Sequence, residues 1–233
     1  MARVSKNGPL PAGEQKARAV RTMFDAIAPR YDLLNRLLTF GMDVRWRKRS
    51  VRALRLPAGS RVLDLACGTG DLCRELHRAR MRPVGLDFAY EMLAHARTDA
   101  PLVQADILRI PTGTATVDGI TCGFALRNVT DLRALFAEIA RVVRPGGTIA
   151  LLEVAEPRSK LLRAGHALYF NRVVPFVGGL LSSKEAYSYL PRSVVYLPPS
   201  DEMLAMLRDV GFHDARRTAL SGGIAQLLTG TRA

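Results

Sequence analysis

The chain has 233 residues, three cysteines and a formal net charge of +13. That length fits one α/β domain with an elaboration, and 48% hydrophobic residues is ordinary for a globular protein. The cysteines form no C-x-x-C pair and have no histidine at ligand spacing, which excludes a disulfide framework and a zinc site. The first twenty residues lack the apolar core of a signal peptide, and no run is long enough to span a membrane, so we expect a cytoplasmic protein.

The positive charge is concentrated near the N-terminus. Residues 1–55 contain 13 Lys/Arg against 4 Asp/Glu, and much of the surplus lies in residues 45–55. A basic face of this kind attracts anionic lipid or nucleic acid, whereas an Arg-rich proteome would produce the same surplus on a merely solvated face. Trp46, the only tryptophan, fits either a membrane interface or a core. Residues 1–18 are expected to form a disordered basic tail.

Helix and strand signals alternate through the middle of the chain. The segment 23–41 has apolar residues at helical spacing and is broken by Pro29. Strands are expected at 62–66, 83–87, 102–106, 117–126 and 148–156, and helices at 70–81, 90–98 and 131–147. The alternation predicts a parallel sheet with both faces covered, and ligands at the carboxyl ends of its strands.

A different rhythm follows the fifth strand. Residues 157–199 form a long apolar and aromatic insertion with four of the six tyrosines, and a helix is expected at 199–212. Two further strands are expected at 213–220 and 224–231, where the chain closes. The sequence therefore predicts one domain over 19–233, with a mostly parallel seven-stranded sheet that ends in an antiparallel pair.

The most informative segment is RVLDLACGTGDL, residues 61–72. It is typical of a buried strand that runs into a Gly-rich turn and a helix. Asp87 closes the next strand, 23 residues after Asp64, at the position where a nucleoside ribose is usually held. Cys73 replaces the third glycine of a dinucleotide fingerprint, and no Lys-Ser or Lys-Thr follows, which excludes a P-loop. An adenosine-type cofactor is predicted, with a generic strand–helix turn as the alternative.

The cofactor loop resembles the first motif of class I S-adenosylmethionine-dependent methyltransferases, with Ala66 in place of its first glycine. Three further blocks resemble the quinone C-methyltransferase family, which methylates demethylmenaquinone and the related ubiquinone precursor. These blocks are residues 24–48, 124–131 and 185–194. The resemblance implies a Rossmann-like class I methyltransferase fold, S-adenosylmethionine as cofactor, and an acceptor-side role for the insertion 157–199.

The resemblance also implies which residues bind the cofactor. The backbone at Gly68 and Gly70 can approach the methionine and ribose closely, because glycine has no Cβ. Asp87 is expected to accept from the ribose hydroxyls and Asp106 from the adenine amino group, while Asp64 orders the loop. Helix capping or solvation is the alternative for each acid. The implied set is Asp64, Gly68, Thr69, Gly70, Asp87, Phe88, Ala105, Asp106 and Gly123.

On the acceptor side, the resemblance implies Arg127 and Asn128 as catalytic residues. A permanently charged arginine can stabilise a quinol oxyanion or hold a water that takes the proton. The alternative for Arg127 is an ion pair with Asp131. No metal is required. The acceptor pocket is expected to include Tyr31, His166, Tyr187 and Tyr189.

The implied activity is methyl transfer to a ring carbon of a reduced prenylated quinone, from demethylmenaquinol to menaquinol. The sequence departs from the family pattern at Gly123, Ala125 and the C-terminus. These departures leave open the alternative of a methyltransferase of the same fold that acts on another phenolic or polyketide-like ring. A non-catalytic, basic RNA-binding module is the third alternative, although aromatic platforms are absent. Expected partners are the lipophilic quinol and an anionic surface at the inner face of the cell membrane, with no nucleic acid. A homodimer is left open.

Overall fold

The computed structural model describes residues 13–157, 159 and 193–233. The strands are β1 (Arg61–Leu65), β2 (Arg82–Asp87), β3 (Leu102–Gln104), β4 (Val117–Gly123), β5 (Val143–Val154), β6 (Phe212–Leu220) and β7 (Ala225–Arg232). The α-helices are α1 (Gly13–Ile27), α2 (Tyr31–Leu38), α3 (Met42–Leu54), α4 (Asp71–Arg78), α5 (Tyr90–Ala94), α6 (Leu132–Val142) and α10 (Ser200–Asp209). The 3-10 helices are η1 (Ala28–Arg30), η2 (Leu126–Asn128), η4 (Val194–Tyr196) and η5 (Ser221–Gly223).

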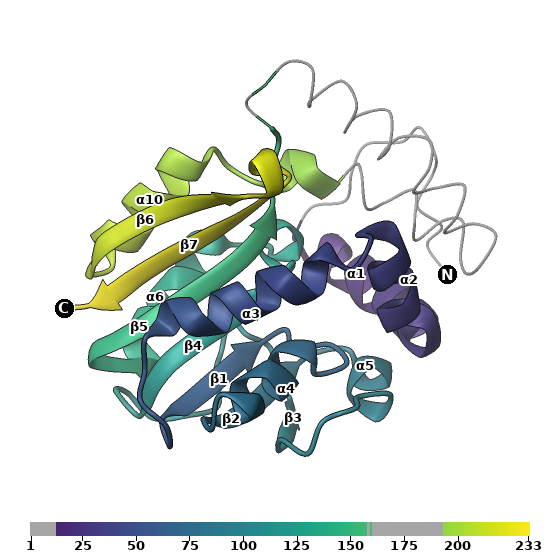
Figure 1. Ribbon diagram of the computed structural model, residues 1–233, viewed down its shortest axis with the longest axis horizontal. Helices are drawn as coiled ribbons and strands as arrows, with labels where there is room; N and C mark the ends of the chain where they lie inside the picture. Colours follow the sequence, from purple (N-terminus) through teal and green to yellow (C-terminus); the bar gives the residue numbers. More distant parts are fainter. Residues whose placement is uncertain (1–12, 158, 160–192) are drawn as a thin grey trace.

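The strands form one sheet in the order β3-β2-β1-β4-β5-β7-β6 (Figure 1). The pairs from β3 to β5 are parallel, and β7 runs antiparallel to both of its neighbours. This arrangement confirms the predicted fold class, including the C-terminal antiparallel pair.

Several boundaries differ from the expected ones. Helix α1 begins at Gly13, so the tail boundary predicted at residue 18 falls inside a helix. Within α1, the buried Lys16 donates from Nζ to the carbonyl of Val129 at 2.8 Å, which ties the helix to the domain. Helix α6 ends at Val142 and β5 begins at the next residue, where Val143 already pairs with β4.

The core lies on both faces of the sheet, because successive strand residues point to opposite sides. Leu63 and Leu65 of β1 belong to the cluster that includes Phe136 of α6 and residues of α10. Val62 belongs to the opposite cluster, with residues of α3 and α4. Figure 1 shows α3 and α4 in front of the sheet and α6 behind it.

Trp46 is part of the core. Its side chain belongs to the cluster under α3, the residue is 6% exposed, and its indole N–H donates to the Ser221 hydroxyl at 2.8 Å. A buried, hydrogen-bonded tryptophan of this kind holds α3 against the C-terminal strands. The membrane-interface alternative for Trp46 is therefore wrong. In the described part of the chain, no helix combines the length and the apolar character needed to cross a membrane.

The topology places a crevice beside β1. From β1 the chain moves outward through β2 and β3, and it then returns to the other side of β1 to form β4 and β5. The loops that follow β1 and β4 consequently diverge at the carboxyl edge of the sheet, which is where open α/β sheets bind their ligands. Helices α1 and α2 pack at this edge (Figure 1).

Candidate active site

The loop after β1 is built from left-handed backbone conformations. Ala66, Gly68 and Gly70 have φ values of 51°, 55° and 83°. Glycine adopts this region without a steric penalty, whereas Ala66 carries a Cβ in it and is strained. At Gly70 a Cβ would lie 2.6 Å from Cγ2 of Thr98, so a side chain is excluded there. The loop therefore brings bare backbone to the crevice and starts α4 immediately afterwards.

Asp87 lies at the end of β2, opposite this loop. Its Oδ2 accepts from the backbone N–H of Gly68 at 2.8 Å, and its Oδ1 accepts from the N–H of Ala89 at 2.9 Å. The residue is 5% exposed, and this burial raises the pKa of the carboxyl group. Each oxygen keeps further acceptor capacity, because a carboxylate offers about four lone-pair sites. Asp87 thus fastens the loop and can still accept from ligand hydroxyls.

A cavity of about 430 Å³ opens between these loops, in the size range of roughly 300–1,000 Å³ typical of small-molecule sites. Six of the predicted cofactor residues border it. They are Gly68, Asp87, Phe88, Ala105, Asp106 and Gly123. These residues come from four different strand ends or loops, and the topology brings them together at one edge of the sheet.

The other three predicted cofactor residues do not border the cavity. Thr69 is buried and its hydroxyl donates to a carboxylate oxygen of Asp32 in α2. Gly70 precedes α4 in a left-handed conformation. Asp64 is fully buried beneath the loop, where it accepts from the Thr121 hydroxyl at 2.8 Å. These three residues shape and support the loop.

Burial raises the pKa of Asp64 from 3.8 to about 7, and the hydrogen bond from Thr121 opposes this shift. The folded state then binds a proton more readily than the unfolded chain. The free energy of unfolding should therefore fall as the pH rises from about 4 to about 7. Asp87 shifts in the same direction, so a variant is needed to isolate the contribution of Asp64.

Asp64→Asn should remove the part of the pH dependence of stability that the titration of Asp64 causes. Compared with the wild type, the variant should gain up to about 4 kcal/mol of stability between pH 4 and pH 7, because its amide never ionises. Urea unfolding of both proteins at several pH values in this window measures the difference. Parallel stability curves for the two proteins would show that Asp64 does not titrate there.

Arg127 is buried against β5. Its Nη1 is ion-paired with Glu153 and donates to the carbonyl of Phe124 at 2.9 Å, and its Nε donates to the Ser193 hydroxyl at 3.2 Å. The ion pair expected with Asp131 is absent, because the Asp131 side chain instead caps α6 by accepting from the N–H of Ala134 at 2.9 Å. The alternative that paired Arg127 with Asp131 is therefore wrong. The neighbouring catalytic candidate, Asn128, borders the cavity, whereas Arg127 does not.

Of the four residues predicted to line the acceptor pocket, Tyr31 alone falls in the described part of the chain. Tyr31 borders the cavity and packs edge-to-face against Phe24, with ring centroids 5.9 Å apart. Burial raises the pKa of its phenol, so the hydroxyl stays protonated at neutral pH. His166, Tyr187 and Tyr189 lie outside the described residues.

The contribution of α1 was missed by sequence reasoning. Ala17, Val20, Arg21 and Phe24 of this helix border the cavity. Val20, Arg21 and Phe24 follow Ala17 by three, four and seven positions, which places all four on one face of a helix. The signal was therefore present in the sequence. Glu153 was also missed, because the residues around a single acid in an apolar strand do not indicate which side chain it pairs with.

The residues at the cavity fit S-adenosylmethionine. A buried carboxylate, Asp87, is available for a ribose diol, and a second acid, Asp106, borders the same space. Side chains of Phe88, Ile107 and Leu108 provide apolar surface for an adenine ring. The bare backbone of the loop after β1 suits the methionine portion.

Solved structures share this fold at low sequence identity. A methyltransferase from Aquifex aeolicus, described as SAM-dependent, aligns with a TM-score of 0.58 and 16% identity over 80% of this chain and 89% of its own. The [4+2]-cyclase SpnF aligns with a TM-score of 0.67 and 16% identity over 97% and 99% of the chains. One fold thus hosts different reactions, so the site must supply the function. The chain thus has the class I methyltransferase fold, with a cavity whose residues fit S-adenosylmethionine.

The sequence assigns the chain more narrowly. The model of the ubiE/COQ5 methyltransferase family matches residues 12–232, and the chain belongs to this family. A ubiquinone/menaquinone biosynthesis C-methyltransferase of Geobacter sulfurreducens is 41% identical over 94% of this chain and 90% of its own length. Demethylmenaquinone methyltransferases of Roseiflexus castenholzii and Deinococcus radiodurans are both 42% identical, over 96% and 95% of this chain and 97% of their own lengths. The family predicted from the four sequence blocks is confirmed.

Proposed function

We propose that the chain transfers a methyl group from S-adenosylmethionine to a ring carbon of a reduced prenylated quinone, from demethylmenaquinol to menaquinol. The observation that carries this proposal is 41–42% identity, over more than nine-tenths of the chain, to proteins named for this reaction or for C-methylation in quinone biosynthesis. The preserved block 124–131 supports it, because Asn128 within that block borders the cavity.

The bound S-adenosylmethionine supplies an electrophilic methyl group. The chain contributes binding and orientation: Asp87 accepts from the ribose hydroxyls, and the backbone at Gly68 holds the methionine portion. Phe88 and Asp106 complete the adenine side. Holding donor and acceptor next to each other provides much of the rate, because the reaction then needs no further encounter.

Arg127 is proposed to stabilise the acceptor oxyanion. Once the quinol hydroxyl has lost its proton, the oxygen is anionic and the neighbouring ring carbon becomes nucleophilic. Nε and Nη1 of Arg127 serve Ser193, Phe124 and Glu153, whereas Nη2 makes no hydrogen bond with any described residue. The two Nη2 donors are therefore available for the oxyanion. Asn128 is proposed to orient the ring from the cavity wall.

A methyl-transfer assay tests the proposal. Purified protein is incubated with S-adenosylmethionine and reduced demethylmenaquinone in vesicles, and menaquinone is measured by mass spectrometry. Methylated product supports the proposal. Binding of S-adenosylmethionine without any product would instead indicate a different phenolic acceptor. The absence of nucleic-acid binding stays a prediction, and a homodimer stays an open alternative.

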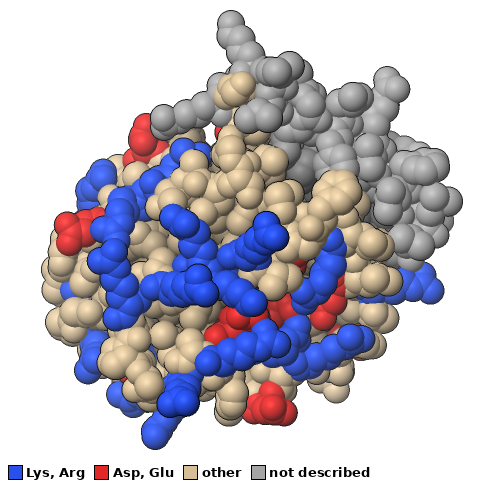
Figure 2. Space-filling view, in the orientation of Figure 1, with Lys and Arg blue, Asp and Glu red and all other residues tan. Residues whose placement is uncertain are grey.

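We further propose that the protein works at the cytoplasmic face of an anionic membrane, where a prenylated quinol resides. Helix α3 carries exposed Arg45, Lys48 and Arg49, and basic side chains spread over this face (Figure 2). On the preceding segment, Leu33 and Phe40 are 59% and 77% exposed. Basic and apolar groups exposed on consecutive segments suit the boundary between headgroups and acyl chains. Arg47 is excluded from this surface, because it is buried and paired with Asp43.

Reversing the charge at Arg45, Lys48 and Arg49 to glutamate should weaken binding to anionic vesicles about 100-fold or more, because each basic residue near such a surface contributes about 1 kcal/mol. Vesicle co-sedimentation at low salt measures the binding. The same charge reversal at three other exposed arginines, Arg133, Arg144 and Arg216, is the matched control. Equal binding by both triple variants would contradict the membrane-facing role of α3.

A further inference from the structure

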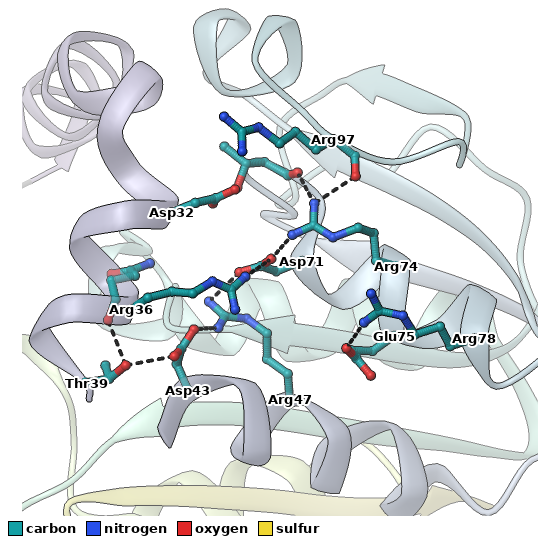
Figure 3. Close-up of polar contacts among 12 residues, drawn as sticks. Asp32, Arg36, Thr39, Asp43, Arg47, Asp71, Arg74, Glu75, Arg78 and Arg97 are labelled. Carbon is teal, nitrogen blue, oxygen red and sulfur yellow. Dashed lines mark hydrogen bonds and ion pairs between the residues drawn. The ribbon is translucent and has the colours of Figure 1, made fainter. Parts of the chain in front are cut away.

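Asp71 connects three helices at the edge of the cofactor loop (Figure 3). It is the first residue of α4, and its carboxylate is 3.0 Å from Nη2 of Arg36 in α2 and 3.3 Å from Nη2 of Arg47 in α3. Arg74 of α4 pairs with the same carboxylate. A carboxylate at a helix N-terminus is also stabilised by the helix dipole. One acid thus holds the N-terminal helices against the loop that precedes α4.

A second contact joins α2 to the same loop. The Thr69 hydroxyl donates to Asp32, one turn before Arg36 on α2. On the other side of the loop, the carbonyl of Thr69 accepts from the backbone N–H of Arg97 at 3.0 Å and from Nη1 of Arg74 at 3.4 Å. Helix α2 is therefore attached through Asp32 and Arg36 at two points, Thr69 in the loop and Asp71 directly after it. The loop itself is held by the hydrogen bonds from Arg97 and Arg74.

The three arginines around Asp71 differ in their surroundings. Arg47 is 6% exposed and pairs with both Asp71 and Asp43, so its removal would leave buried acids without a partner. The Arg36 side chain is 40% exposed, and Asp71 is its one ion-pair partner in the described part of the chain. Arg36 is therefore the member of the group that salt can screen and that mutation can remove without disturbing the core.

The position of α2 determines one wall of the cavity. Tyr31, its first residue, borders the cavity, and its Cε1 lies 4.0 Å from where a Cβ on Gly68 would be. Phe24 of α1 packs against Tyr31 and borders the same space. Any movement of α2 away from the loop would open this wall and expose the bound ligand to water.

We propose that Arg36 and Asp71 form a positioning pair that holds α2 closed over the bound S-adenosylmethionine. Because this ion pair is partly exposed, salt screens it and weakens its hold on α2. The affinity for the cofactor therefore decreases as ionic strength rises. The inference rests on the proposed function only for the identity of the cofactor. It does not depend on which aromatic acceptor is methylated.

The test is binding of S-adenosylhomocysteine, measured by calorimetry without any quinol. Arg36→Gln should raise the dissociation constant about fivefold, and Arg36→Lys should restore part of the affinity. Between about 0.05 M and about 0.5 M NaCl, the wild-type dissociation constant should rise, whereas that of Arg36→Gln should change little. With an active acceptor, KM for S-adenosylmethionine should rise while kcat stays within about twofold.

Arg78→Gln is the matched control. Arg78 also pairs with an acid of α4, Glu75, but its side chain is 64% exposed, and among the described residues it makes no hydrogen bond or ion pair with α2 or the loop. This variant should keep wild-type affinity and wild-type salt dependence. If Arg36→Gln also keeps both, the positioning role is wrong. If binding responds as expected while no quinone is methylated, the positioning role stands and the assigned acceptor fails.

Discussion

Arg127→Met should lower kcat of methyl transfer by about 10²- to 10³-fold, the usual effect of removing one group that stabilises an oxyanion. The dissociation constant for S-adenosylhomocysteine should stay close to that of the wild type, because Arg127 does not border the cavity. Steady-state kinetics with reduced demethylmenaquinone measure the effect on kcat. Calorimetry with S-adenosylhomocysteine measures the effect on binding separately.

The same substitution should also destabilise the fold. The Arg127 and Glu153 side chains are 8% and 0% exposed, so the loss of the guanidinium leaves a buried carboxylate without its counter-charge. Removing one partner of such a pair costs about 3–5 kcal/mol. Urea unfolding of Arg127→Met should show a loss of this size, and an inactive protein could then be explained by unfolding alone.

A double variant separates catalysis from folding. Arg127→Met combined with Glu153→Gln removes both charges, and replacing a whole buried pair is often neutral for stability. The N–H of Val154 donates to Glu153 Oε1 at 2.8 Å, and the amide oxygen introduced by Glu153→Gln can still accept this hydrogen bond. The double variant should therefore regain most of the stability and remain inactive. Recovery of activity together with stability would show that Arg127 has only a structural role.

Asp87→Ala should weaken binding of S-adenosylhomocysteine about 100-fold or more. The carboxylate is expected to accept from the ribose hydroxyls, and hydrogen bonds to a charged group contribute about 1.5–3 kcal/mol each. The variant also loses the acceptor for the Gly68 N–H at 2.8 Å, so the loop would no longer be fastened to β2. Calorimetric titration measures the change.

Two controls limit the interpretation of Asp87→Ala. Asp87→Asn keeps one acceptor oxygen and should fall between the wild type and the alanine variant. Asp99→Ala removes an exposed acid from the loop before β3 and should bind like the wild type. A dissociation constant for Asp87→Ala within about twofold of the wild type would contradict the assignment of Asp87 to the ribose.

Local pattern and the family resemblance were sufficient for the sheet and for part of the cavity. Apolar runs bounded by glycine and proline marked the strands, because a strand buried on both faces must be continuously hydrophobic. Asp87 was found because it closes the strand that follows the Gly-rich turn, and the ends of parallel strands converge at one edge of the sheet whatever their distance in the chain. Asp106 was found through the family resemblance. The family blocks likewise needed only the order of residues.

Tertiary structure decided which side chains meet. The partner of Arg127 is Glu153, 26 positions away on β5, whereas the nearer Asp131 caps a helix. Trp46 is buried by contacts with strands at the other end of the chain. Arg47 belongs to the basic segment, but it is buried and paired with Asp43 and Asp71 instead of facing solvent. Local sequence determines periodicity and turn geometry, but pairing across the sheet depends on how whole elements pack. The composition of this chain therefore predicted a basic N-terminal face, and only its folding determined which of those charges reach the surface.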